Sequence, residues 1–170
     1  MRKVLIVIDM QNDFIDGVLG TAEAQKIVSE VKKIIDDFDG DVFFTRDTHG
    51  QDYMSTQEGK HLPIPHCIKG TDGWQITSAL CTEKACEIID KPTFGYLSIA
   101  DIISEKGKNI SEITIVGLCT DICVISNAMI LKAAFPETLI TVVSSACAGV
   151  TPQSHQNALD AMKMCQINII

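Results

Sequence analysis

Cys123, Asp9 and Lys91 are residue types that together could attack a carbonyl group. Cys123 lies where an apolar run passes into an expected helix, and the free backbone N–H groups and dipole of a helix start lower a thiol's pKa and stabilise an oxyanion. A carboxylate such as Asp9 could accept the thiol proton and pass it to a leaving group. A lysine such as Lys91 would keep that carboxylate ionised. Taken singly, the three residues also fit structural roles: a buried thiol, a loop-capping carboxylate and a solvated strand end.

Asp47 and His49 lie two positions apart, and His66 follows toward the end of the same long segment. A carboxylate and two imidazoles suit a divalent transition metal that keeps positions open for water or substrate. Histidines in a polar loop are also often simply exposed, so spacing alone leaves both interpretations open. His61 and His155 have no comparable partner in the sequence, and we interpret them as surface residues.

The elements that must position these residues alternate between short apolar runs and amphipathic helical patterns. A helix is expected after the N-cap candidate Thr21, closed by Asp39-Gly40, and two others at residues 121–134 and 152–164. Strands are expected at residues 3–8, 42–45, 86–90, 113–116, 139–144 and 166–170. This alternation predicts an α/β fold in which helices cover both faces of a parallel sheet.

Ligands of open parallel sheets bind beyond the carboxyl ends of the strands. The first expected strand ends at Asp9, the second runs into Asp47 and His49, the third ends beside Lys91, and the fourth leads into Cys123. The topology therefore predicts that residues far apart in the sequence meet at one edge of the sheet. Residues 46–74 show no clear element, and a loop of that length is uncommon unless it is functional.

Composition excludes several classes of protein. The chain has 170 residues, 46% of them hydrophobic and 21% charged, which predicts a single globular domain over residues 1–170. The net charge of −8 argues against a nucleic-acid or membrane partner, and no apolar run is long enough to span a bilayer. Seven cysteines without an export signal predict a reduced, cytoplasmic protein. The first strand is not followed by the Gly-rich turn of a dinucleotide-binding enzyme, and Cys119 and Cys123 lack the Cys-x-x-Cys spacing of a thiol–disulfide enzyme.

Five motifs in order resemble those of the isochorismatase-like cysteine hydrolases, and within that family the nicotinamidases. They are Asp9-Met10-Gln11-Asn12-Asp13-Phe14, Arg46-Asp47-Thr48-His49, Pro65-His66-Cys67-Ile68-Lys69-Gly70-Thr71, Lys91-Pro92 and Gly117-Leu118-Cys119-Thr120-Asp121-Ile122-Cys123-Val124. The resemblance covers nearly the whole chain. It implies a three-layer, Rossmann-like fold with six parallel strands, and a catalytic triad made of Asp9, Lys91 and Cys123.

The resemblance also implies details of the site. A cis peptide is expected between Leu118 and Cys119, so that the backbone N–H groups of Cys119 and Cys123 form an oxyanion hole. Phe14 and Leu118 are expected in the substrate pocket. The implied metal ligands are Asp47, His49 and His66, holding zinc by preference, with iron or manganese as alternatives. True isochorismatases generally lack this metal set, which favours amide hydrolysis, and family members commonly form homo-oligomers.

The chain departs from the nicotinamidase pattern ahead of His66. Nicotinamidases often carry a tryptophan there as one wall of the pocket, whereas this chain has Leu62-Pro63-Ile64-Pro65. Trp74, Phe94 or Tyr96 could line the pocket instead. We expect a cysteine amidohydrolase that converts nicotinamide to nicotinate and ammonia. The alternatives are a related small-amide or carbamoyl hydrolase of the same family and a non-catalytic binding module.

Overall fold

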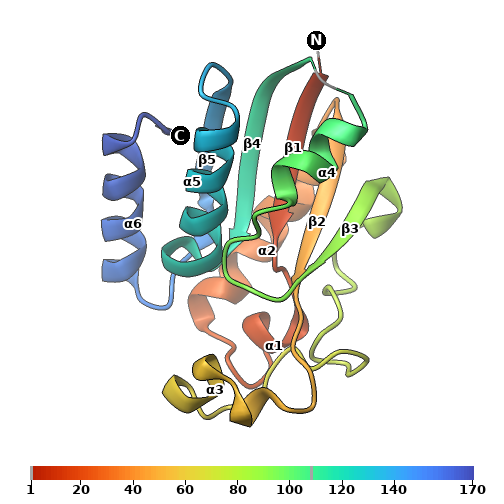
Figure 1. The fold of residues 1–170 in the computed structure, drawn as a ribbon, viewed down its shortest axis with the longest axis vertical. Coiled ribbons are helices and arrows are strands. Elements are labelled where there is room, and N and C mark those ends of the chain that lie inside the picture. The colour runs from red at the N-terminus through yellow and green to blue at the C-terminus, as the bar shows by residue number, and fades with distance from the viewer. Residues whose placement is uncertain (1, 108) are drawn as a thin grey trace.

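A computed structural model describes residues 2–107 and 109–170 and contains one sheet of six parallel strands. The strands lie in the order β3-β2-β1-β4-β5-β6 (Figure 1). Their bounds are β1 Arg2–Ile8, β2 Asp41–Asp47, β3 Ala85–Lys91, β4 Ile110–Leu118, β5 Leu139–Ala148 and β6 Asn168–Ile169. The expected α/β class and six-stranded parallel sheet are therefore confirmed.

Helices cover both faces of this sheet, as the sequence predicts. Helix α2 (Ala22–Asp37) lies behind the sheet in Figure 1, whereas α4 (Ile99–Glu105), α5 (Ile125–Ala134) and α6 (Pro152–Met164) lie in front of it. The strand β1 shows why both faces are covered, because alternate side chains point to opposite faces of a sheet. Val4, Ile6 and Ile8 pack in the cluster with α4, α5 and α6, and Leu5 and Val7 pack in the cluster with α2.

Helix boundaries follow local capping chemistry. The hydroxyl of Thr21 accepts a hydrogen bond from the Ala24 N–H and begins α2, as predicted. Thr151 begins α6 in a reciprocal arrangement with Ser154, and the predicted bounds 152–164 are confirmed. The terminal strand is shorter than predicted, because α6 is followed by a turn at Gln166 with a positive φ of 63°.

The segment between β2 and β3 contains helices that the sequence pattern does not predict. A 3-10 helix covers Tyr53–Ser55 and a short helix, α3, covers Gln57–His61. The Thr56 hydroxyl accepts a hydrogen bond from the Gly59 N–H and caps α3. These helices are too short to show the apolar periodicity on which sequence-based prediction depends. The remaining short elements are α1 (Asn12–Ile15) and a 3-10 helix at Thr82–Lys84.

The helix predicted at residues 121–134 is two elements in the structure. Residues Thr120–Val124 form a π-helical turn, in which the Val124 N–H donates to the Cys119 carbonyl at 3.0 Å, and α5 follows directly. Such turns are rare and are frequent at functional sites. The expected cis peptide between Leu118 and Cys119 is confirmed immediately before it.

The strand order reverses between β1 and β4, which defines the point where ligands of open α/β sheets bind. Gly117 permits the close approach of these two strands at their carboxyl ends. Its φ is +117°, and a Cβ there would lie 2.1 Å from the Ile8 carbonyl oxygen. The strand ends beyond this contact are therefore held tightly side by side.

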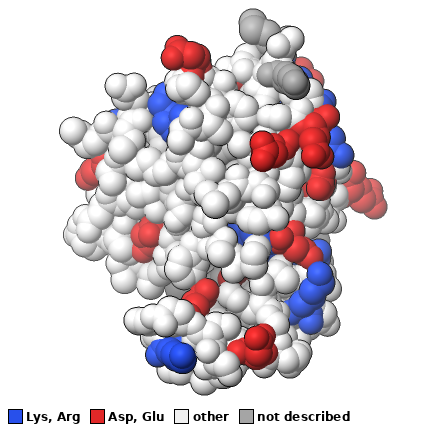
Figure 2. Space-filling view, in the orientation of Figure 1, with Lys and Arg blue, Asp and Glu red and all other residues white. Residues whose placement is uncertain are grey.

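The surface is acidic overall, as the net charge of −8 requires. Figure 2 shows acidic side chains gathered along one edge of the visible face, with basic side chains among them. Among residues 2–107 and 109–170, no helix is both long and apolar enough to cross a membrane.

Candidate active site

The structure brings Asp9, Lys91 and Cys123 together at the carboxyl edge of the sheet. The Lys91 ammonium lies 2.6 Å from Asp9 Oδ2 and 3.3 Å from Cys123 Sγ. All three residues are buried. A carboxylate, an ammonium and a thiol in mutual contact are a set of groups that can move a proton and stabilise a developing thiolate.

Each of the three side chains is fixed by the element that carries it. Asp9 follows β1 with a positive φ of 46°, and the Thr45 hydroxyl donates a hydrogen bond to Asp9 Oδ1 at 2.6 Å. Lys91 is the last residue of β3, and its Nζ also donates to the Thr93 carbonyl. Cys123 lies in the π-helical turn, where the Asn127 amide donates to the Cys123 carbonyl at 2.8 Å. The reacting groups therefore need no large rearrangement to meet.

Burial outweighs the electrostatic effects that we expected at Cys123 and Asp9. Burial, with the nearby Asp9 charge, raises the pKa of the Cys123 thiol well above its usual value. The prediction that the helix start lowers this pKa is therefore wrong. Burial also raises the pKa of Asp9, although Lys91 acts in the opposite direction. The pKa of Lys91 is raised too, because the neighbouring anions outweigh its desolvation. The resting site therefore holds a neutral thiol beside a carboxylate that is a stronger base than usual.

A second group of polar side chains lies beside the first and includes all three predicted metal ligands. One potential ligand atom from each of Asp47, His49, His66 and Glu58 lies within 4.8 Å of the others. His49 Nε2 is 2.9 Å from Asp47 Oδ2, and His66 Nε2 is 3.6 Å from Glu58 Oε1. Distances of this size separate neighbouring ligands around one ion when each bond to the metal is about 2.0–2.2 Å.

A hydrogen bond outside this group orients the His66 ring so that Nε2 points toward the other potential ligands. The His66 Nδ1 lies 2.8 Å from the Ile64 carbonyl, which can only accept, so Nδ1 carries a proton and Nε2 is the nitrogen that faces Asp47 and Glu58. Burial alone would raise the pKa of Asp47, but the bonds to His49 and His66 hold it far below its usual value. The residues present thus fit a divalent metal ion, by ligand type and by the separation of the ligand atoms.

Glu58 and Gln11 belong to this site, although neither is among the residues predicted from the sequence. Glu58 lies on α3, a helix without a sequence signal, so nothing in the sequence placed it near His66. Gln11 is fully buried. Its Oε1 accepts from the Asp47 N–H at 2.7 Å, and its Nε2 donates to the carbonyls of Asp47 and Trp74. This amide therefore fixes the backbone of Asp47. The one sequence signal for this role is that Gln11 lies in the motif Asp9–Phe14.

Lys91 connects the two groups. Its Nζ is 3.4 Å from Asp47 Oδ1 as well as 2.6 Å from Asp9 Oδ2. One buried cation therefore balances a carboxylate of each group. A change of protonation or charge in one group alters the electrostatic potential at the other.

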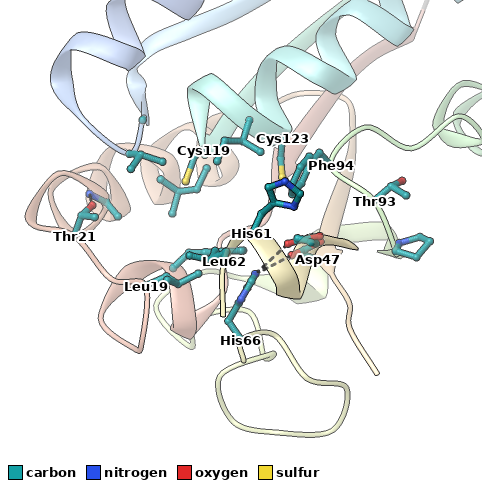
Figure 3. A pocket seen from close by; sticks show the side chains of 18 of the residues that line it. Leu19, Thr21, Asp47, His61, Leu62, His66, Thr93, Phe94, Cys119 and Cys123 are labelled. Atoms are coloured by element: carbon teal, nitrogen blue, oxygen red, sulfur yellow. Dashed lines mark hydrogen bonds and ion pairs between the residues drawn. The ribbon is translucent and has the colours of Figure 1, made fainter. Parts of the chain in front are cut away.

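A cavity of about 680 Å³ opens between the two groups (Figure 3). Phe14 and Leu118, the predicted pocket residues, both line it, and the Phe14 ring lies 5.5 Å from the His66 ring. Its lining consists of Phe14, Leu19, Thr21, Ala24, Asp47, Gln57, Glu58, His61, Leu62, His66, Pro92, Thr93, Phe94, Leu118, Cys119, Ile122, Cys123, Gly149 and Val150. A small molecule in this cavity would contact the thiol and the metal ligands at once.

Of the three aromatic residues that could replace the usual pocket tryptophan, one lines the cavity. Phe94 lines the cavity, whereas Trp74 and Tyr96 are not among the lining residues. Trp74 instead covers the Arg46 guanidinium at 3.7 Å, and its indole N–H donates to the Thr48 hydroxyl. It therefore supports the loop around the site rather than the wall of the cavity.

The two histidines interpreted as surface residues both make contacts that the sequence does not predict. His61 is exposed, but it lines the cavity, and its Nδ1 lies 2.9 Å from the Gln57 carbonyl. His155 is only partly exposed, and its Nδ1 pairs with the Thr120 hydroxyl at 2.7 Å, which joins α6 to the π-helical turn. His155 therefore remains partly at the surface, but it has a partner that the sequence does not predict, because the chain brings α6 against that turn.

Comparisons with known proteins agree with this geometry. The Mycobacterium tuberculosis nicotinamidase/pyrazinamidase is 27% identical over 186 residues, covering 99% of this chain and 98% of that protein. The structure of Pyrococcus horikoshii pyrazinamidase in complex with zinc matches with a TM-score of 0.83 and 26% identity, over 100% of this chain and 99% of that one. N-carbamoylsarcosine amidase from Thermoplasma acidophilum matches with a TM-score of 0.80 and 25% identity, over 99% and 95% of the two chains. The sequence model of the isochorismatase domain matches residues 3–170, and the chain therefore belongs to the isochorismatase family.

Proposed function

We propose that this protein is a cysteine amidohydrolase that converts nicotinamide to nicotinate and ammonia. The observation that carries the proposal is the contact of Asp9, Lys91 and Cys123 at the wall of a cavity that also holds the Asp47, His49, Glu58 and His66 group. The relatives named nicotinamidase and pyrazinamidase support the choice of substrate.

In the proposed mechanism, Asp9 accepts the proton of the Cys123 thiol when the substrate is bound. The Lys91 ammonium, 3.3 Å from Sγ, stabilises the thiolate as it attacks the amide carbon. The backbone N–H groups of Cys119 and Cys123 are proposed to hold the oxyanion. The C–N bond then breaks, and Asp9 returns the proton to the departing ammonia, which leaves a thioester on Cys123.

Hydrolysis of the thioester completes the cycle. Asp9 takes a proton from a water molecule, whose oxygen attacks the thioester carbon. The C–S bond breaks, the proton on Asp9 passes to Cys123 Sγ, and the carboxylic acid product loses its remaining proton to solvent and leaves as nicotinate. Phe14 and Leu118 are proposed to hold the two sides of the ring during both steps, since both line the cavity.

We propose that Asp47, His49 and His66 bind a divalent metal with Glu58 as a fourth ligand, and that the ion is zinc rather than iron or manganese. The zinc in the pyrazinamidase of Pyrococcus horikoshii supports this identity. When bound, the ion supplies a Lewis acid for the ring nitrogen of the substrate. Gln11 and Lys91 both contact Asp47 and are proposed to keep it in place for the ion.

Metal content tests this assignment. Protein purified without a chelator should contain close to one divalent ion per chain, and Asp47→Asn should lose most of it because the substitution removes a buried anionic ligand. Elemental analysis measures both. Asp52→Asn is the matched control, since Asp52 lies in the same segment but is exposed and outside the ligand group. An unmodified protein without zinc, iron or manganese would contradict the assignment.

The second candidate function is the hydrolysis of another small amide or of a carbamoyl compound by the same residues. It is favoured by the structural match to N-carbamoylsarcosine amidase and by Leu62 on the cavity wall ahead of His66, where nicotinamidases often place an aromatic side chain. A cytoplasmic location and a homo-oligomer remain predictions from the sequence and the family resemblance.

A panel of amides separates the two functions. Ammonia release is measured with nicotinamide, pyrazinamide and N-carbamoylsarcosine at equal concentrations. We expect kcat/KM for the two ring amides to exceed that for the carbamoyl compound by at least tenfold, because the apolar side chains of Phe14 and Leu118, which both line the cavity, are proposed to contact the ring. A preference for the carbamoyl compound would reject nicotinamide as the substrate and leave the cysteine mechanism in place.

A further inference from the structure

The cavity is much larger than the substrate of the proposed function. Its volume of about 680 Å³ lies in the range of roughly 300–1,000 Å³ that is typical of sites for drug-sized ligands. A single pyridine ring with its carboxamide fills only a minor part of this space. The part beyond the reacting groups is therefore open to a further portion of a ligand.

Apolar side chains from three separate parts of the chain belong to the lining of this cavity. Leu19 and Ala24 come from the start of α2 and the turn before it, Ile122 from the π-helical turn, and Val150 from the loop after β5. Val150 is 51% exposed, although the Asp121 carboxylate accepts a hydrogen bond from its backbone N–H and fixes its position. A preformed apolar wall that remains exposed to water favours a ligand with an apolar group to cover it.

The charged residues of the cavity lining also favour a ligand whose distant portion is uncharged. Among the described residues, neither lysine nor arginine lines the cavity, whose charged or basic side chains are Asp47, Glu58, His61 and His66. The one nearby ammonium, on Lys91, is buried and paired with Asp9. A carboxylate on the distant portion of a ligand would lose its hydration and find neither a lysine nor an arginine in the lining, where the carboxylates of Asp47 and Glu58 would repel it.

We propose that the cavity selects uncharged heteroaromatic amides that carry an apolar substituent on the ring, and that it discriminates against the same amides with a carboxylate substituent. This inference rests on the proposed function and extends it, because it assigns the apolar part of the cavity to substrate selection. The residues assigned to this selection are Leu19, Ala24, Ile122 and Val150.

A matched set of substrates tests the proposal. Nicotinamides bearing a propyl or a carboxyethyl group at ring carbon 5 or 6 are compared with nicotinamide itself by ammonia release. Each buried methylene contributes about fourfold to binding, so kcat/KM for at least one propyl isomer should exceed that for nicotinamide by tenfold or more. Both carboxyethyl isomers should fall below nicotinamide by tenfold or more. The proposal would be overturned if kcat/KM for both propyl isomers did not exceed that for nicotinamide, or if kcat/KM for the carboxyethyl compounds equalled that for the propyl compounds.

A charge introduced at the rim provides the second test. Val150→Arg places a cation beside the apolar space and should raise the ratio of kcat/KM for carboxyethyl over propyl substrates by at least tenfold. Leu139→Arg is the matched control, because Leu139 is 52% exposed but begins β5 at the opposite end of the sheet. An equal change of the ratio in both variants, or no change in Val150→Arg, would overturn the assignment of the apolar space.

Binding to the inactive Cys123→Ala variant keeps this test separate from the proposed function. Calorimetry with that variant compares propyl and carboxyethyl amides without turnover, and a tenfold tighter binding of one propyl isomer is expected. If nicotinamide is not hydrolysed but this preference is found, the proposed function fails and the inference stands. If nicotinamide is hydrolysed but no preference is found, the proposed function stands and the inference fails.

Discussion

Replacing Cys123 by alanine is expected to lower kcat for ammonia release from nicotinamide by at least about 10³-fold, since losses of this size or larger follow removal of a nucleophile. The side chain is small and the site is otherwise unchanged, so the fold should be retained. In the proposed mechanism Asp9 acts as the base and Lys91 as the cation, so the Cys123 thiol is the group that forms the covalent bond to the substrate carbon. Steady-state assays of wild type and variant measure the loss.

Cys119→Ala is the matched control for this prediction. Cys119 lines the same cavity four residues earlier, and burial raises the pKa of its thiol to about 12. Its proposed contribution comes from the backbone N–H, which alanine keeps, so activity should stay within about tenfold of wild type. Mass spectrometry after acid quenching should find the acyl group on the peptide that contains Cys123. Equal activity of Cys123→Ala and wild type would reject the cysteine mechanism.

Much of the fold follows from the sequence because the strands are buried on both faces. Runs such as Val4–Ile8 are apolar throughout, which identifies them, and parallel order follows from the helices between them. The short helices between β2 and β3 could not be predicted in this way. Their formation depends on the Thr56 cap and on tertiary contacts, including the Tyr53 hydroxyl bonded to the Leu62 carbonyl.

Strand ends were the strongest guide to the site. Asp47 and Lys91 end β2 and β3, and Asp9 directly follows β1, so the edge rule places all three together without knowledge of the strand order. Glu58 could not be found by that rule because it comes from α3, which packs across the edge from outside the sheet. A rule based on strands identifies the floor of a site but not the segments that cover it.

The charge state of the site could not be predicted from the sequence. The expectation of a lowered thiol pKa considered only the start of a helix, whereas Cys123 is buried next to a carboxylate. Desolvation of a fully buried group changes a pKa by several units, which exceeds the effect of a helix terminus. A thiol that stays neutral until Asp9 accepts its proton also avoids reaction with other electrophiles in the resting enzyme.

Lys91→Met is expected to lower the free energy of unfolding by about 3–5 kcal/mol, because it leaves the carboxylates of Asp9 and Asp47 buried without their cation. Without Lys91, the already raised pKa of Asp9 rises further, and Asp9 must be ionised to accept the thiol proton. The acidic limb of the pH–kcat/KM profile should therefore move to higher pH. Urea unfolding and steady-state kinetics across pH measure the two effects.

The stability deficit of Lys91→Met should itself depend on pH. A carboxyl group whose pKa is raised in the folded state binds more protons there than in the unfolded state, so its contribution to stability falls as pH rises above the unfolded pKa of about 3.9. The deficit should accordingly be smaller near pH 5 than near pH 8. Adding Asp9→Asn to Lys91→Met removes one unpaired charge and should restore part of the stability without restoring activity. If the double variant were no more stable than Lys91→Met, the buried charge balance would not be what holds this edge of the sheet together.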